Sequence, residues 1–147
     1  MTEILDNRVL WTAIIANVVA QVLKVFIVLI NEKRWKPGRA FETGGMPSSH
    51  TATVTALIVG IGISKGWDSI LFAAVAVYGY IVIYDATNVR RAAGDQATVL
   101  NQLVSTFENA FDEKSRPQAL KTLLGHSYLQ AFVGALVGII TGLISFL

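Results

Sequence analysis

The chain has 147 residues, of which 53% are hydrophobic and only 15% are charged, with a formal net charge of +2 and a mean hydropathy of +0.54. This balance is more apolar than that of soluble proteins and predicts a single membrane-embedded domain over residues 1–147. The sequence contains no cysteine, which excludes disulfides and thiolate chemistry, and its small net charge gives no indication of nucleic acid binding.

Four apolar segments are candidates for transmembrane helices, which predicts an all-α integral membrane bundle. In chain order they cover about Val9–Ile30, Ser48–Ile63, Ser69–Tyr84 and Ser127–Leu147. Two of them are near the short limit for crossing a hydrocarbon core of about 30 Å. Residues 1–7 form a short polar tail without the three-part pattern of a cleaved signal peptide.

The stretch Asp85–Gly125 between the third and fourth segments is the longest polar part of the chain. Apolar side chains recur in it at helical spacing, which predicts an amphipathic helix: Val99, Leu100, Leu103, Val104, Phe107 and Phe111. Pro117 predicts a break, after which a short helix ends at Gly125 and contains Leu120, Leu123 and Leu124. We expect an amphipathic helical hairpin that packs against the end of the bundle.

The heptapeptide GGMPSSH at residues 44–50 opens the second segment. Glycine lets the backbone approach a ligand closely, and serine hydroxyls at a helix start lie beside free N–H groups at the positive end of the helix dipole. This pattern predicts a phosphate site at Ser48 and Ser49. The alternative is a serine N-cap followed by a surface histidine.

Ionisable side chains beside the apolar segments are the other candidates for function. Lys24 lies deep in the first segment, where a cation is costly unless it faces a partner or a wet cavity, and the alternative is snorkelling to the membrane surface. His126 opens the fourth segment as His50 opens the second, and the sequence has no other histidine. Asp85 follows the third segment. The nearby arginines are Arg34, Arg39, Arg90 and Arg91.

Histidine, arginine and lysine at one membrane face suit phosphoryl transfer. Arginines and helix N-termini stabilise the negative charge of the transition state, while one imidazole attacks phosphorus and another protonates the leaving oxygen. Metal-ligand spacings such as His-x-x-x-His and His-x-x-Glu do not occur in the sequence, so we expect neither a metal nor another cofactor.

Three sequence blocks, with Lys24 upstream, resemble the divergent bacterial branch of the type 2 phosphatidic acid phosphatase and vanadium haloperoxidase superfamily: GGMPSSH at 44–50, DATNVRR at 85–91 and LLGH at 123–126. The resemblance covers nearly the whole chain. It implies that His50 is the general acid for the leaving group and that His126 is the nucleophile that forms a phosphohistidine. It assigns phosphate binding to Lys24, Arg34 or Arg39, Ser48, Ser49, and Arg90 or Arg91.

The chain departs from the family pattern at three points. Ser49 replaces the glycine of the Pro-Ser-Gly-His signature, and 34 residues separate Arg91 from His126. Gln130 stands where the family has the acidic partner of the nucleophile. An amide can orient the imidazole but cannot neutralise an imidazolium, so catalysis is weaker or Asp85 supplies the missing charge.

The resulting hypothesis is a membrane phosphatase that hydrolyses a lipid phosphate or a polyprenyl (pyro)phosphate. The alternative is a catalytically degenerate protein that binds or transports lipid phosphates or other anions. Gly134, Gly138 and Gly142 recur every fourth residue. This row predicts close helix contact, either within the monomer or in a homodimer.

The basic residues outside the apolar segments predict how a multi-pass protein would sit in the cell membrane. Nine of them fall in the loops on one side and two on the other: Lys33, Arg34, Lys36, Arg39, Arg90, Arg91, Lys114, Arg116 and Lys121 against Arg8 and Lys65. The positive-inside rule therefore places both termini outside and the catalytic face towards the cytoplasm. Resemblance to outward-facing lipid phosphatases implies the opposite orientation.

Overall fold

A computed structural model of the chain describes residues 2–33, 35, 37–38, 44–107 and 118–147. Within these residues every regular element is a helix, which confirms the all-α fold class. In chain order the elements are α1 (Thr2–Leu5), α2 (Arg8–Glu32), α3 (Ser49–Lys65), α4 (Ile70–Tyr84), the π-helix η2 (Asp85–Val89), α5 (Arg90–Thr106) and α6 (Tyr128–Ile144).

Polar side chains define where the long apolar helices begin. The N-cap residues of α2, α3, α4 and α6 are Asn7, Ser48, Ser69 and Ser127. Each side chain accepts a hydrogen bond of 3.0–3.3 Å from the backbone N–H three residues later. These bonds satisfy N–H groups that a helix leaves unpaired at its start. The four predicted apolar segments consequently match these helices to within three residues at every end.

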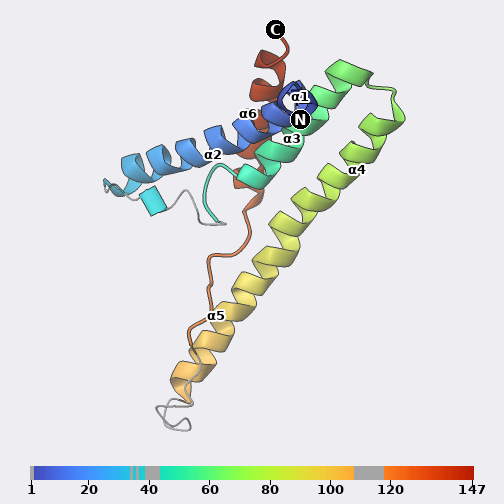
Figure 1. The fold of residues 1–147 in the computed structure, drawn as a ribbon. Coiled ribbons are helices and arrows are strands. Elements are labelled where there is room, and N and C mark those ends of the chain that lie inside the picture. Colours follow the sequence, from blue (N-terminus) through green and yellow to red (C-terminus); the bar gives the residue numbers. More distant parts are fainter. Residues whose placement is uncertain (1, 34, 36, 39–43, 108–117) are drawn as a thin grey trace.

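Helix α3 is the centre of the bundle and packs against α2, α4 and α6 (Figure 1). Its inward positions carry small side chains, and Ala52 and Ala56 are fully buried. Many apolar side chains of α2, α4 and α6 are instead exposed on the outside of the bundle. An apolar exterior around a core of small residues is the pattern of helices that pack in lipid, where close backbone approach stabilises the contact.

The glycine row of α6 faces α3 within the same chain. A Cβ atom added at Gly138 would lie 2.5 Å from the carbonyl oxygen of Ala52, and one at Gly134 would overlap the carbonyl oxygen of Ser48. Gly142 packs against Val59 in the same way. Packing within the monomer therefore accounts for the row, and a homodimer stays a prediction.

Two stretches of the described chain are long and apolar enough to cross a membrane: α2, with 25 residues, and the continuous helix Ile70–Thr106, with 37 residues. Helix α6 is a shorter apolar helix. Helices α3 and α6 have 17 residues each, a length of about 25 Å, which is less than a hydrocarbon core of about 30 Å. The count of four transmembrane helices therefore stays a prediction.

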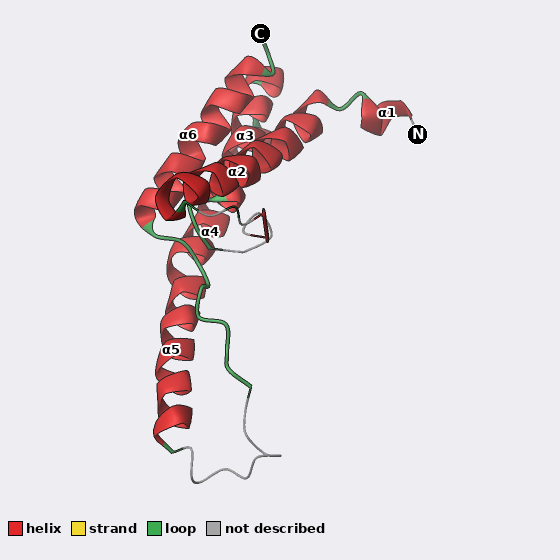
Figure 2. Cartoon of the chain, turned by 90° about the vertical axis from the view of Figure 1, so that its left-hand side faces the viewer, coloured by secondary structure: helices red, strands yellow, loops and turns green. Residues whose placement is uncertain are grey.

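The polar stretch after the third segment differs from the prediction in two ways. The chain does not leave the helix at Asp85 but continues through η2 into α5, so that α4, η2 and α5 form one long rod (Figure 1). The predicted amphipathic helix is confirmed as α5. The predicted second helix of the hairpin is wrong over residues 118–125, which run beside α5 without helical structure (Figure 2). Phe111 and Pro117 lie outside the described residues.

Contacts with α5 explain why residues 118–125 are not helical. The side-chain amide of Asn101 donates a hydrogen bond to the carbonyl oxygen of Leu120 and accepts one from the N–H of Leu120, both at 2.9 Å. Gly94 has no side chain to keep the carbonyl oxygens of Thr122 and Leu124 away from the helix. The backbone N–H and carbonyl groups of Leu120 thus find partners on α5. The segment returns the chain to the end of the bundle where α3 and α6 begin.

Candidate functional site

The two histidines lie side by side where α3 and α6 begin. Their ring centroids are 5.9 Å apart and the rings are tilted by 60°. His50 is the second residue of α3, and His126 directly precedes Ser127, the N-cap of α6. The backbone N–H of His126 donates to the carbonyl oxygen of Ala86 in η2 at 2.8 Å. Three elements that are distant in sequence therefore meet at this pair.

Most imidazole nitrogens of the pair are buried without a hydrogen-bond partner among the described residues. They are Nδ1 and Nε2 of His126 and Nδ1 of His50. Buried polar atoms in proteins are nearly always paired, and an unpaired one costs about 1–3 kcal/mol. The unpaired atoms therefore mark the histidine pair as a candidate binding site.

Lys24 brings a positive charge to the same place from α2. Its side chain is 1% exposed, so it does not snorkel to the membrane surface. Its stem runs past Gly45, where an added Cβ would lie 3.4 Å from Lys24 Cδ. Gly45 also has φ +94°, a backbone conformation that favours glycine. The charge of Lys24 acts on both His50 and His126.

His126 is a neutral imidazole at neutral pH. Burial, followed by the neighbouring His50 and Lys24, lowers the pKa of His126 to about 4. The side chain of Gln130 and the backbone of Gly45 act in the opposite direction but do not offset this. A neutral imidazole has the free electron pair that a nucleophile requires.

Gln130 lies beside His126, and its carboxamide both acts on the imidazole and caps α6. Its Oε1 accepts a hydrogen bond from the N–H of Ser127 at 3.0 Å, while Ser127 Oγ accepts from the N–H of Gln130 at 3.3 Å. This reciprocal pair is a capping box, which fixes the start of α6. Gln130 therefore holds the backbone next to His126.

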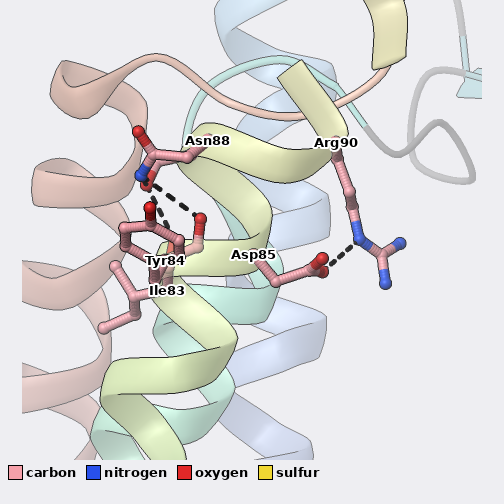
Figure 3. Close-up of polar contacts among 6 residues, drawn as sticks. Ile83, Tyr84, Asp85, Asn88 and Arg90 are labelled. Atoms are coloured by element: carbon pink, nitrogen blue, oxygen red, sulfur yellow. Dashed lines mark hydrogen bonds and ion pairs between the residues drawn. The ribbon is translucent and has the colours of Figure 1, made fainter. Parts of the chain in front are cut away.

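Asp85 and Arg90 form an ion pair across η2 (Figure 3). The charges of both residues act on His50. Arg91 is exposed, and its backbone packs against Gly125, which has φ +76°. Of the two adjacent arginines, Arg90 is thus the one whose charge acts on His50.

The remaining predicted residues are only partly placed. Ser48 is fully buried, and its Oγ accepts hydrogen bonds from Thr51 N at 3.3 Å and from Thr51 Oγ1 at 3.0 Å. The serine N-cap that the sequence offered as an alternative is therefore present, and phosphate binding by Ser48 and by the buried Ser49 stays a prediction. Arg34 and Arg39 lie outside the described residues.

Sequence reasoning missed the residues that connect η2 to α6. Tyr128 donates its hydroxyl to Oδ1 of Asn88 at 3.0 Å, 40 positions away in sequence. Ala86 accepts from the backbone of His126 at a similar separation. A backbone acceptor has no sequence signature, and a lone tyrosine or asparagine beside an apolar segment is commonplace. The contacts become visible only when η2 and α6 are seen together.

Two comparisons with known proteins match nearly the whole chain. A family model described as "Divergent PAP2 family" matches residues 5–141. A protein of Bacillus subtilis (strain 168) described as "Uncharacterized membrane protein YuiD" is 42% identical over 151 residues, which cover 97% of this chain and 96% of that protein. No solved structure matches the chain. The range 5–141 that the family model matches spans the histidine pair and Lys24, Asp85, Arg90 and Gln130.

The lowered pKa of His126 can be measured directly because the chain has only two histidines. We expect imidazole NMR titration in detergent micelles to show His126 neutral at pH 6, and a His50→Gln variant assigns the signals. With a folded pKa of about 4 and an ordinary value near 6.5, the unfolded chain binds the extra proton first. Stability should therefore fall as the pH drops from about 6.5 towards 4. A midpoint for His126 at 6.5 or above would show that the ring is not enclosed.

Proposed function

The chain belongs to the divergent PAP2 family of membrane proteins, and on that premise we propose that it hydrolyses a lipid phosphate or a polyprenyl (pyro)phosphate at the histidine pair. The observation that carries the proposal is the contact between two imidazoles whose buried nitrogens lack partners. Lys24 and Arg90 supply positive charge to the same place. A tetrahedral anion offers acceptors and negative charge, which match these groups.

In the proposed reaction His126 is the nucleophile and His50 the general acid. A nitrogen of the neutral His126 ring donates its electron pair to phosphorus, and the bond from phosphorus to the ester oxygen breaks. The electron pair of that bond leaves with the oxygen, which takes a proton from the protonated form of His50. A water molecule then attacks the phosphohistidine and gives a proton to His50, and release of phosphate returns the electron pair to His126.

The cations act on the charge that the phosphate carries throughout the reaction. Negative charge on the equatorial oxygens is stabilised by Lys24 and by the guanidinium of Arg90, and the N-terminus of α3 adds its partial positive charge. The same negative charge favours the protonated form of a neighbouring imidazole. Substrate binding thus helps to supply the proton that His50 must donate.

A second function is favoured by the position of Gln130. Gln130 is a neutral amide whose Oε1 also caps α6, so this position supplies no carboxylate to the His126 ring. A histidine without such a partner is a weaker nucleophile. We therefore keep as the alternative a protein that binds or transports lipid phosphates without hydrolysing them.

The roles of the two histidines can be separated by the leaving group of the substrate. We expect His126→Ala to abolish phosphate release from every substrate, because the nucleophile is lost. His50→Ala should abolish release of poor leaving groups such as aliphatic alcohols but spare p-nitrophenyl phosphate, whose leaving group needs no proton. Phosphate release in detergent measures both. Equal losses on the two substrate types in His50→Ala would contradict the general-acid role.

The Gln130→Glu variant tests whether a missing carboxylate limits turnover. Glutamate can keep the capping box and adds a negative charge beside His126, which stabilises the imidazolium. We expect phosphate release to rise by about tenfold or more, given the losses seen when a triad carboxylate is removed. Gln130→Asp is the matched control, since its shorter side chain does not complete the box. An unchanged rate in Gln130→Glu would mean that another group orients His126.

We further propose a multi-pass arrangement in the cell membrane with the histidine pair at the cytoplasmic face. Arg8 and Lys65 lie at the end of the bundle that also carries the two chain termini (Figure 1). Lys33 directly follows the end of α2, and Arg90 and Arg91 are the first two residues of α5. Lys121 follows Leu120, which is bound to Asn101 of α5. Lys114, Arg116 and Lys36 fall outside the described residues. The excess of basic residues at the histidine end supports a cytoplasmic orientation.

Cysteine labelling in intact cells tests this orientation, because the chain has no native cysteine. Lys65 and Lys121 are both exposed and lie on opposite sides of the proposed membrane. A cysteine at position 65 should react with an impermeant maleimide before lysis, and one at position 121 only afterwards. Labelling in the reverse order would place the histidine pair outside the cell.

A further inference from the structure

The π-helix η2 places Asp85 and Arg90 on one side of the long helical rod. The N–H of Arg90 donates to the carbonyl oxygen of Asp85, the five-residue spacing of a π turn. In a regular α-helix, residues five apart point roughly 140° away from each other. The wider π turn brings them together, and Nε of Arg90 donates to Oδ2 of Asp85. In Figure 3 this pair lies on one side of the rod and Asn88 points to the other.

Stability alone does not explain the ion pair. The side chains of Arg90 and Asp85 are 49% and 39% exposed, and ion pairs with this exposure stabilise proteins little. π turns are rare and concentrate at functional sites. The pair also lies where its charges act on His50.

The geometry of the pair leaves the binding end of Arg90 available. Asp85 contacts Nε, and the two terminal nitrogens of the guanidinium point away from the carboxylate (Figure 3). A guanidinium held by one edge retains donors for bidentate binding of a phosphate. An unrestrained arginine side chain would have to be ordered by the phosphate itself, which weakens binding.

We propose that Asp85 is the positioning residue of Arg90, and that η2 exists in this chain to hold the arginine by Nε so that its terminal nitrogens bind the phosphate at His50. This inference rests on the proposed phosphate site. It differs from the role in which Asp85 supplies the missing charge to His126, because here Asp85 acts through the guanidinium of Arg90.

The test measures anion binding as well as turnover in the full chain in detergent. The probe is inorganic vanadate, a mimic of the pentacoordinate phosphate, with phosphate release from a lipid phosphate measured in parallel. We expect Asp85→Ala to weaken vanadate binding and raise KM by about tenfold, with a smaller change in kcat, because the arginine loses its orientation. Asp85→Asn should change the vanadate affinity and KM by about threefold at most, since the Oδ1 of asparagine still accepts a hydrogen bond from Nε of Arg90.

A double-mutant cycle separates positioning from a general charge effect. In the Arg90→Lys background no Nε is present, so Asp85→Ala should cause no further loss. Asp95→Ala is the matched control, because Asp95 is an exposed carboxylate on α5 in the same helical rod, and it should behave as the wild type. Asp85→Ser, which also loses the acceptor, must give the same shift as Asp85→Ala and replaces it if the alanine variant unfolds.

Two results would overturn the inference: vanadate binding in Asp85→Ala equal to that in Asp95→Ala, or equal losses from Asp85→Ala with and without Arg90. If the wild type binds vanadate but releases no phosphate, the double-mutant cycle is evaluated from vanadate affinities alone, and these affinities decide the inference. If the wild type neither binds vanadate nor releases phosphate, the proposed function fails and the positioning role fails with it.

Discussion

The close approach of α6 to α3 is the contact on which the rest of the structure depends. Because α6 presents Gly134 and Gly138 to α3, the carbonyl oxygens of Ser48 and Ala52 can lie where a Cβ would otherwise stand. The two helices consequently begin at the same level, and Ser48 donates its N–H to the carbonyl oxygen of Gln130 at 3.0 Å. Each helix carries a histidine at its start. Any larger residue in the glycine row would separate the helices and the two imidazoles with them.

The π turn provides the second constraint, since its five residues and the one that follows connect the long rod to the start of α6 and carry the charged pair that acts on His50. Ala86 binds the backbone of His126, Asn88 binds Tyr128, and Arg90 is held by Asp85. Asn88 and the Asp85–Arg90 pair lie on different sides of the rod (Figure 3). A regular α-helix would present a different set of side chains to α6 and to His50. The two constraints together bring His126 and His50 into contact at the end of the bundle, with Arg90 close enough for its charge to act on His50.

Much of this arrangement could be predicted from the sequence, because apolar runs bounded by serine caps determine α2, α3, α4 and α6, and because two histidines at two helix starts indicated a shared site. The rest depended on contacts between distant residues. Residues 118–125 have apolar residues at helical spacing, yet Asn101 pairs with the backbone of Leu120 and removes the need for a helix. The π turn has no sequence signature of its own. Gln130 occupies the expected place, but only the structure reveals that its oxygen caps α6.

The central claim is that His126 and His50 act on one phosphate, and detection of a covalent intermediate tests it most directly. The full chain would be incubated with a lipid phosphate, quenched at alkaline pH where a phosphoramidate survives, and digested for mass spectrometry. We predict phosphate on the peptide that contains His126, and its loss in His126→Ala. Turnover without phosphate on His126, or with phosphate on another residue, would contradict it.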